Sequence, residues 1–120
     1  MSDKIPTEHQ EQVGLIAWFR LNYPHLLIFA IPNGEKRAMS VAKRLKLEGV
    51  VSGVPDLAIC LPDGQLLWVE MKRIKGSRLS QEQKDVHKLL ENLGHSVIVG
   101  YGAKDASEKI IIFLHKVLAS

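Results

Sequence analysis

The sequence predicts an α/β domain in which a mixed central β-sheet is flanked by helices. Helix-like and strand-like hydrophobic patterns follow one another in the order α-β-α-β-β-α-β-α. Hydrophobic residues make up 46% and charged residues 24% of the chain, close to the averages for globular domains. A length of 120 residues suits one domain over residues 1–120, and we expect residues 1–6 to form a flexible tail.

The first half of the chain contains two predicted helices around one predicted strand. Residues 7–10 have the capping-box pattern Thr-Glu-His-Gln, and the apolar residues after them favour a helix that ends near residues 22–24. Residues 26–31 form a short apolar run that is closed by Pro-Asn-Gly, which indicates a buried strand entering a turn. Residues 38–48 are rich in helix formers and stop at Gly49, so we expect a second helix there.

The second half of the chain predicts a β-hairpin followed by a helix, a strand and a helix. Residues 56–61 and 65–72 are strand-like and are joined by Pro-Asp-Gly, a typical hairpin turn. Residues 80–83 form a second capping box, which opens an amphipathic helix ending at Gly94. A strand over 96–101 and a helix over 106–118 complete the pattern, which contains no internal repeat.

Several classes of protein are disfavoured. The longest apolar runs are far shorter than the roughly 18 residues of a membrane-spanning helix, and the first residues lack the pattern of a signal peptide, so we expect a cytoplasmic protein. The single cysteine, Cys60, lies in an apolar run and is predicted to be a buried, inert thiol. The five histidines lack zinc-ligand spacing and are expected at the surface or at helix ends.

Positive charge is concentrated in two segments. The formal net charge is +3, yet residues 36–46 hold five basic residues and residues 72–78 hold four, with no acidic residue in either segment. Either segment alone is typical of a solvated surface. Together they favour a polyanionic partner.

The most informative pattern is Pro55-Asp56 followed by Glu70-Met71-Lys72. Alternation along a strand points Glu70 and Lys72 to the same face, and the predicted hairpin brings Asp56 beside them. Two adjacent carboxylates repel each other unless a cation offsets their charge, and oxygen ligands suit Mg²⁺ or Mn²⁺. Such a site beside a lysine is suited to phosphodiester hydrolysis. The alternative is an exposed Glu70–Lys72 pair, with Asp56 capping a turn.

The arrangement Pro55-Asp56 with Glu70-x-Lys72 resembles the signature of the PD-(D/E)XK nucleases. Further motifs resemble the VRR-Nuc branch of that superfamily, particularly its small stand-alone bacterial and phage members. These motifs are Glu8-x-x-x-Gln12, Ile31-Pro32-Asn33-Gly34 with Arg37, Gly49 and Gly53, and Gly76-x-x-Leu79-Ser80-x-x-Gln83. The resemblance spans roughly residues 7–118 and implies a restriction-endonuclease-like core.

The resemblance also implies roles for individual residues. Asp56 and Glu70 are expected to bind Mg²⁺ or Mn²⁺, with the carbonyl oxygen of Met71 as a third ligand and Lys72 as the catalytic lysine. Glu8 completes the acidic cluster. Glu11 is the rival candidate on another face of the same helix, and an acidic residue such as Glu8 is also favoured by the helix dipole alone.

Other polar residues are assigned to the site and to DNA binding. Gln83 resembles an active-site glutamine, although its position in the second capping box gives it a structural role already. Asn33, Gly34 and Arg37 lie at a turn that either holds a phosphate or is only a turn. The expected DNA contacts are Gln12, Asn33, Arg37, Lys43, Arg44, Lys75 and Arg78.

These observations predict an endodeoxyribonuclease that depends on Mg²⁺ or Mn²⁺ and hydrolyses phosphodiester bonds in branched DNA, such as a Holliday junction or a flap. We expect a homodimer in the cytoplasm of a bacterial cell or a phage-infected host. The alternative from another class is a non-catalytic nucleic-acid-binding module with the same fold. An enzyme acting on another phosphorylated substrate is disfavoured because the sequence has no glycine-rich phosphate loop.

Overall fold

The computed structural model describes residues 4–32 and 38–119. The elements within these ranges are α1 (Glu8–Asn22), β1 (Leu27–Ala30), α2 (Met39–Leu47), β2 (Leu57–Cys60), the 3-10 turn η1 (Pro62–Gly64), β3 (Leu66–Lys72), α3 (Gln81–Asn92), β4 (Ser96–Tyr101) and α4 (Ala103–Leu118). Apart from the short η1, this is the predicted order of helices and strands. The predicted α/β class is confirmed.

The strands form one mixed sheet in the order β1-β2-β3-β4. β1 and β3 each pair with β2 in antiparallel fashion, and β4 is parallel to β3. The predicted hairpin is therefore present as β2 and β3. Its turn needs left-handed backbone at two successive residues, Asp63 with φ 63° and Gly64 with φ 73°, and aspartate and glycine are residue types that tolerate this conformation.

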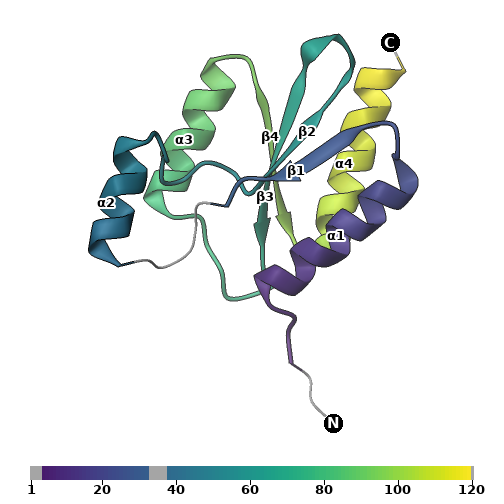
Figure 1. The fold of residues 1–120 in the computed structure, drawn as a ribbon. Helices are drawn as coiled ribbons and strands as arrows, with labels where there is room; N and C mark the ends of the chain where they lie inside the picture. The colour runs from purple at the N-terminus through teal and green to yellow at the C-terminus, as the bar shows by residue number, and fades with distance from the viewer. Residues whose placement is uncertain (1–3, 33–37, 120) are drawn as a thin grey trace.

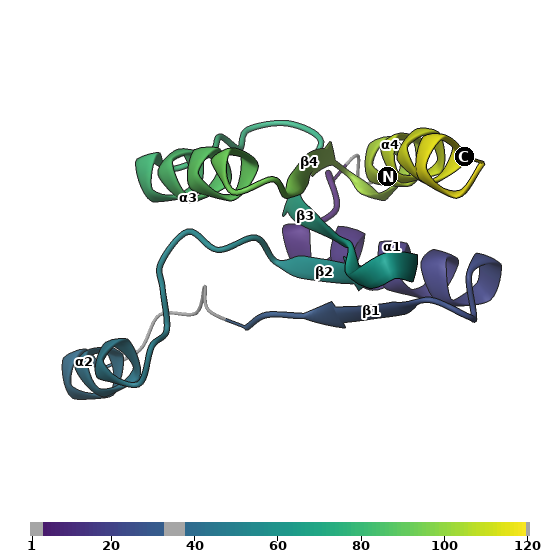
Figure 2. The same cartoon turned by 90° about the horizontal axis from the view of Figure 1, so that it is seen from above.

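Helices cover the two faces of the sheet unequally (Figures 1 and 2). α1 and α4 pack on one face and α3 packs on the other. The main core lies on the α1/α4 face and consists of Leu15, Phe19, Ile28, Leu57, Ile59, Leu61, Leu67, Val69, Met71, Ala106, Ile110 and Leu114. Because strand side chains alternate, β3 sends Val69 and Met71 into this core and turns Glu70 and Lys72 toward the α3 face.

α2 stands apart from the other elements (Figure 2). None of its residues is buried, and Met39 and Leu47 at its two ends are exposed by more than four-fifths of their surface. In the described part of the chain, no helix combines the length and hydrophobicity that crossing a membrane requires.

Three local predictions about the strands and helices are wrong. The predicted buried strand is β1, in which only Ile28 is buried, because β1 is an edge strand of the sheet. α4 begins at Ala103 instead of Ala106, because Glu11 on α1 accepts a hydrogen bond from the Ala103 N–H at 3.0 Å and so caps the helix from a distant part of the chain. Cys60, the last residue of β2, is partly exposed instead of buried. Because Cys60 ends the strand, fewer residues surround its thiol than surround the side chains in the middle of β2.

We predict that Gly100→Ala destabilises the protein by about 1–3 kcal/mol, the usual cost of overpacking. A Cβ atom at Gly100 on β4 would lie 2.4 Å from the Cβ of Ala106 and 2.8 Å from its Cα, so α4 would have to move away from the sheet. The measurement is the free energy of unfolding from urea denaturation.

Gly14→Ala, in the middle of α1, is the matched control. A Cβ atom there would meet only the Cβ of Ala103, at 3.8 Å. We expect that control to be neutral or stabilising, and equal stability of the two variants would contradict the packing argument.

Candidate active site

The hairpin brings Asp56 and Glu70 together. Leu57 pairs with Val69 across β2 and β3, so one step further along the register places Asp56 opposite Glu70. The Met71 N–H donates a hydrogen bond to Oδ2 of Asp56 at 2.7 Å. The side chain of Asp56 thus accepts a main-chain hydrogen bond from β3 just beyond the paired residues of β2. This bond fixes the position of the Asp56 carboxylate relative to β3.

Glu70 is a fully buried carboxyl group, with 0% of its surface exposed. Burial is the largest cause that raises its pKa, from an ordinary value of 4.5 to about 10, and the hydrogen bond and negative charge of Asp56 raise it further, against the opposing effect of Lys72. At neutral pH, the protein without a bound cation therefore holds Glu70 protonated. The site disfavours a second negative charge unless positive charge is added.

α3 contacts both oxygens of Glu70. Nε2 of Gln83 donates to Oε2 at 3.2 Å, and Nε2 of His87 lies 3.1 Å from Oε1. The capping role of Gln83 is confirmed and is compatible with a contact to Glu70, because its Oε1 accepts the Ser80 N–H at 2.8 Å while its nitrogen faces Glu70. Ser80 and Gln83 cap the helix and orient a site residue together.

The expectation that all five histidines lie at the surface or at helix ends is wrong for His87. This residue is 7% exposed and sits in the middle of α3. Burial lowers the pKa of His87, while burial raises that of Glu70. The contact between them at pH 7 is therefore a hydrogen bond between neutral groups in the cation-free protein. The signal in the sequence was the four-residue spacing from Gln83, which places both side chains on one helix face.

Lys72 is buried on the same face as Glu70, with 7% of its surface exposed. Among the described residues it forms no ion pair within 4.0 Å, although its charge lowers the pKa values of Glu70 and Glu8. The ammonium group is thus close enough to influence the acidic residues and is not neutralised by direct contact with one of them.

The structure separates the two carboxylates at the start of α1. Glu8 is partly buried, which raises its pKa, and it feels the charges of Lys72 and Asp56. Glu11 instead caps α4 through Ala103. This geometry favours Glu8 as the helix carboxylate of the site.

The predicted DNA contacts are distributed differently. Asn33, Gly34 and Arg37 lie outside the described residues. Lys43 and Arg44 are exposed on α2, and Arg44 is 3.8 Å from Glu48. Lys75 and Arg78 are exposed in the loop that leaves β3 beside Lys72. Gln12 is half-buried on α1, where it lines a shallow hollow with Val13 and Ile16.

The donor set at Asp56 and Glu70 fits a hard divalent cation. It offers carboxylate oxygens, and burial together with the neighbouring Asp56 raises the pKa of Glu70, so that a cation bound there would favour the ionised carboxylate. Within residues 4–32 and 38–119, no group of three or more histidine, cysteine, aspartate or glutamate side chains is arranged to hold a metal. The carboxylate pair would therefore need further oxygens, such as the main-chain carbonyl of Met71 and water.

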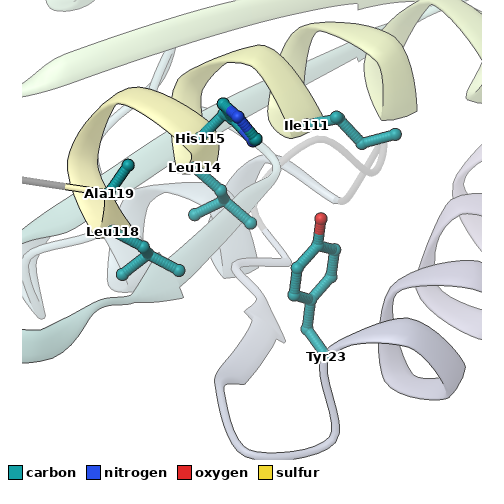
Figure 3. Close-up of a pocket in the computed structure, with 6 residues that line it drawn as sticks. All are labelled: Tyr23, Ile111, Leu114, His115, Leu118 and Ala119. Atoms are coloured by element: carbon teal, nitrogen blue, oxygen red, sulfur yellow. The ribbon is translucent and has the colours of Figure 1, made fainter.

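A separate pocket of about 290 Å³ lies between α4 and the end of α1 (Figure 3). The Tyr23 hydroxyl points between Ile111 and His115, and Leu114 and Leu118 supply apolar walls. Tyr23 follows α1, whose 15 residues begin at Glu8, so this pocket lies about 20 Å from the acidic end of that helix. It is not part of the Asp56–Glu70 site.

The pKa of Glu70 predicts how stability depends on pH. Its folded-state pKa of about 10 exceeds the ordinary 4.5, so between these values the folded state binds more protons than the unfolded state. The stabilisation that protonated Glu70 gives to the folded state, relative to ionised Glu70, is complete below pH 4.5 and is lost as pH rises toward 10. In chelator, we expect Glu70→Gln to gain stability relative to wild type between pH 7 and 9, by at most about 1.4 kcal/mol per pH unit.

Urea denaturation at several pH values checks this expectation. The window above pH 7 avoids the ordinary titration range of histidine. Glu108→Gln, at an exposed position on α4, is the matched control and should run parallel to wild type. A Glu70→Gln curve that also runs parallel to wild type would show that Glu70 is ionised in the folded protein.

Comparison with known proteins supports the fold and shows the family. The model of the VRR-NUC domain family matches residues 3–104. A solved structure described as a VRR_NUC domain protein superposes with a TM-score of 0.72 at 23% identity, over 92% of this chain and 90% of that one. No curated protein matches the chain.

The family match covers most of the sequence, including Asp56, Glu70 and Lys72. The structural match shows the same fold at low sequence identity. The chain belongs to the VRR-NUC family and is a nuclease-family domain.

Proposed function

We propose that this protein is an endodeoxyribonuclease that uses Mg²⁺ or Mn²⁺ to hydrolyse phosphodiester bonds in branched DNA. The observation that carries the proposal is the placement of Asp56 opposite the fully buried Glu70, with Lys72 on the same face. Burying Glu70 and Lys72 beside the half-buried Asp56 is costly for a protein that does not use these charged groups.

Asp56 and Glu70 would hold the cation, together with the carbonyl oxygen of Met71, and Glu8 would complete the acidic side of the site. When bound, the cation supplies positive charge that offsets the phosphate and lowers the pKa of the attacking water. Lys72 would stabilise the charge that builds up on the phosphate, because its ammonium group is held on the face of Glu70 and forms no ion pair with a described carboxylate.

The basic residues around the site suit the DNA backbone. Lys75 and Arg78 leave β3 next to Lys72, and Lys43 and Arg44 are exposed on α2. Such contacts fix the position of DNA without reading its bases, so selectivity would rest on shape. Asn33, Arg37 and Gln12 complete the proposed set of DNA contacts.

We further propose that the working unit is a two-fold homodimer, which presents two sites to a four-way junction or flap. One chain of 120 residues offers limited surface for recognising a branch. Such substrates arise in the cytoplasm of a bacterial or phage-infected cell.

The experiment that tests the proposal is cleavage of labelled four-way junction, flap and linear duplex DNA with Mg²⁺, with Mn²⁺ and with chelator. Metal-dependent cutting that favours the branched substrates supports it. Sedimentation of the protein alone and with junction DNA measures the oligomeric state. Binding without cutting under every condition would favour the non-catalytic nucleic-acid-binding module.

We predict that Asp56→Asn and Glu70→Gln each lower the cleavage rate by at least about 100-fold, because each removes a charged oxygen donor for the cation. DNA binding should remain within a few-fold of wild type, as measured by fluorescence anisotropy in Ca²⁺ or chelator. Glu108→Gln, which removes an exposed carboxylate from α4, should cut like wild type. Full activity in either site variant would rule out the assignment.

Lys72→Ala is expected to lower turnover by about 100-fold or more while the protein still binds Mn²⁺, because the ammonium group acts on the phosphate and not as a metal ligand. Single-turnover cleavage gives the rate, and calorimetric titration with Mn²⁺ gives the affinity. Lys116→Ala, an exposed change near the end of α4, is the control. Loss of Mn²⁺ affinity at a normal single-turnover rate would assign Lys72 a different role.

A further inference from the structure

We infer that His87 is a positioning residue for Glu70, and that it acts with Gln83 as a two-point clamp from α3 that sets the affinity of the site for a divalent cation. The inference rests on the proposed function and deepens it. It concerns how the chain holds a carboxylate ready for a cation.

The clamp is defined by three contacts. Gln83 and His87 reach the two different oxygens of Glu70, at 3.2 Å and 3.1 Å. The amide of Gln83 cannot turn over without losing the Ser80 N–H, which its oxygen accepts at 2.8 Å. Since Ser80 and Gln83 also form the capping box of α3, the start of the helix and the orientation of Glu70 are set by the same residues.

Gln83 contacts only one oxygen of Glu70, and His87 contacts the other. Contacts to both oxygens fix the plane of a carboxyl group, whereas a single contact leaves it free to rotate about the Cγ–Cδ bond. Nε2 of His87 donates or accepts in its contact according to the tautomer of the ring. The histidine side chain is 9% exposed and the glutamate side chain 0%, so water is largely excluded from competing for these oxygens. Asp56, the other proposed ligand, is a neighbour of the same carboxyl group.

Contacts of this kind tune metal sites. Groups that hydrogen-bond to a ligating carboxylate orient it, and losing one typically costs 10–100-fold in metal affinity. His87 is therefore expected to change affinity for the cation without touching the cation or the DNA. Gln83 and His87 come from α3, whereas Asp56 and Glu70 come from the hairpin. α3 and the hairpin must therefore be packed together for the site to form.

The test is a titration of the full chain with Mn²⁺, followed by calorimetry and by electron paramagnetic resonance of the free ion. We expect His87→Leu to weaken Mn²⁺ binding by about 10-fold or more. His87→Gln should restore most of the affinity, because its Nε2 reaches about as far as the histidine Nε2. His87→Asn should not, because its amide is one methylene shorter. This pair keeps the test decisive if His87→Leu fails to fold.

His95→Leu is the matched control. His95 is half-buried on the same side of the sheet, where its ring lies 5.9 Å from that of Trp68, and it has no contact with Glu70. It should leave Mn²⁺ affinity unchanged. Urea denaturation in chelator verifies that each variant is folded at the titration temperature.

The outcomes separate the inference from the proposed function. Mn²⁺ binding by wild type that is lost in Glu70→Gln, with His87→Leu or His87→Asn equal to wild type, would overturn the positioning role and leave the proposed function intact. Absence of any Mn²⁺ binding that depends on Glu70 would overturn both. Equal loss of affinity in His87→Gln and His87→Asn would show that the role of His87 is only to fill space.

Discussion

The burial of Glu70 beside Asp56 is the constraint on which the site depends. A carboxyl group with no exposed surface, next to a second carboxyl group, is costly in the folded state, as the rise of its pKa to about 10 shows. The surrounding structure compensates part of this cost. Gln83 and His87 bond its two oxygens, and Lys72 supplies a positive charge on the same face.

The alternation of side chains along β3 makes the burial of Glu70 compatible with a stable fold, because core residues lie on one face of the strand and site residues on the other. Val69 and Met71 are wholly buried in the core under α1 and α4, while Glu70 and Lys72 face α3. β3 is also an inner strand, with β2 on one side and β4 on the other. Glu70 therefore stands on a strand that is held on both sides, which suits a site whose geometry must be precise.

Local patterns in the sequence predicted most of the fold, and the start of α4 and the burial of His87 were missed because they depend on contacts between distant residues. The limits of β4 match the prediction because apolar residues and flanking glycines mark both ends. The start of α4 was misplaced because its cap is Glu11, which lies 92 residues away. The same contact distinguishes Glu11 from Glu8, a choice that two acidic residues in one helical turn left open. The Asp56–Glu70 pair was predictable because a hairpin register is set locally, whereas the buried place of His87 depends on how α3 packs against the sheet.

Gln83 caps α3 and contacts Glu70 at the same time, so its structural role does not exclude the proposed role at the site. A capping box fixes the side chain of its third helical residue, because the side-chain oxygen is held by a main-chain N–H. In α3 that restraint leaves the amide nitrogen directed at Glu70. One helical turn later His87 meets the other oxygen, so the register of α3 that begins at Ser80 determines how both side chains meet the carboxyl group. A change that shifted the start of this helix would therefore disturb the site even though it altered none of the charged residues.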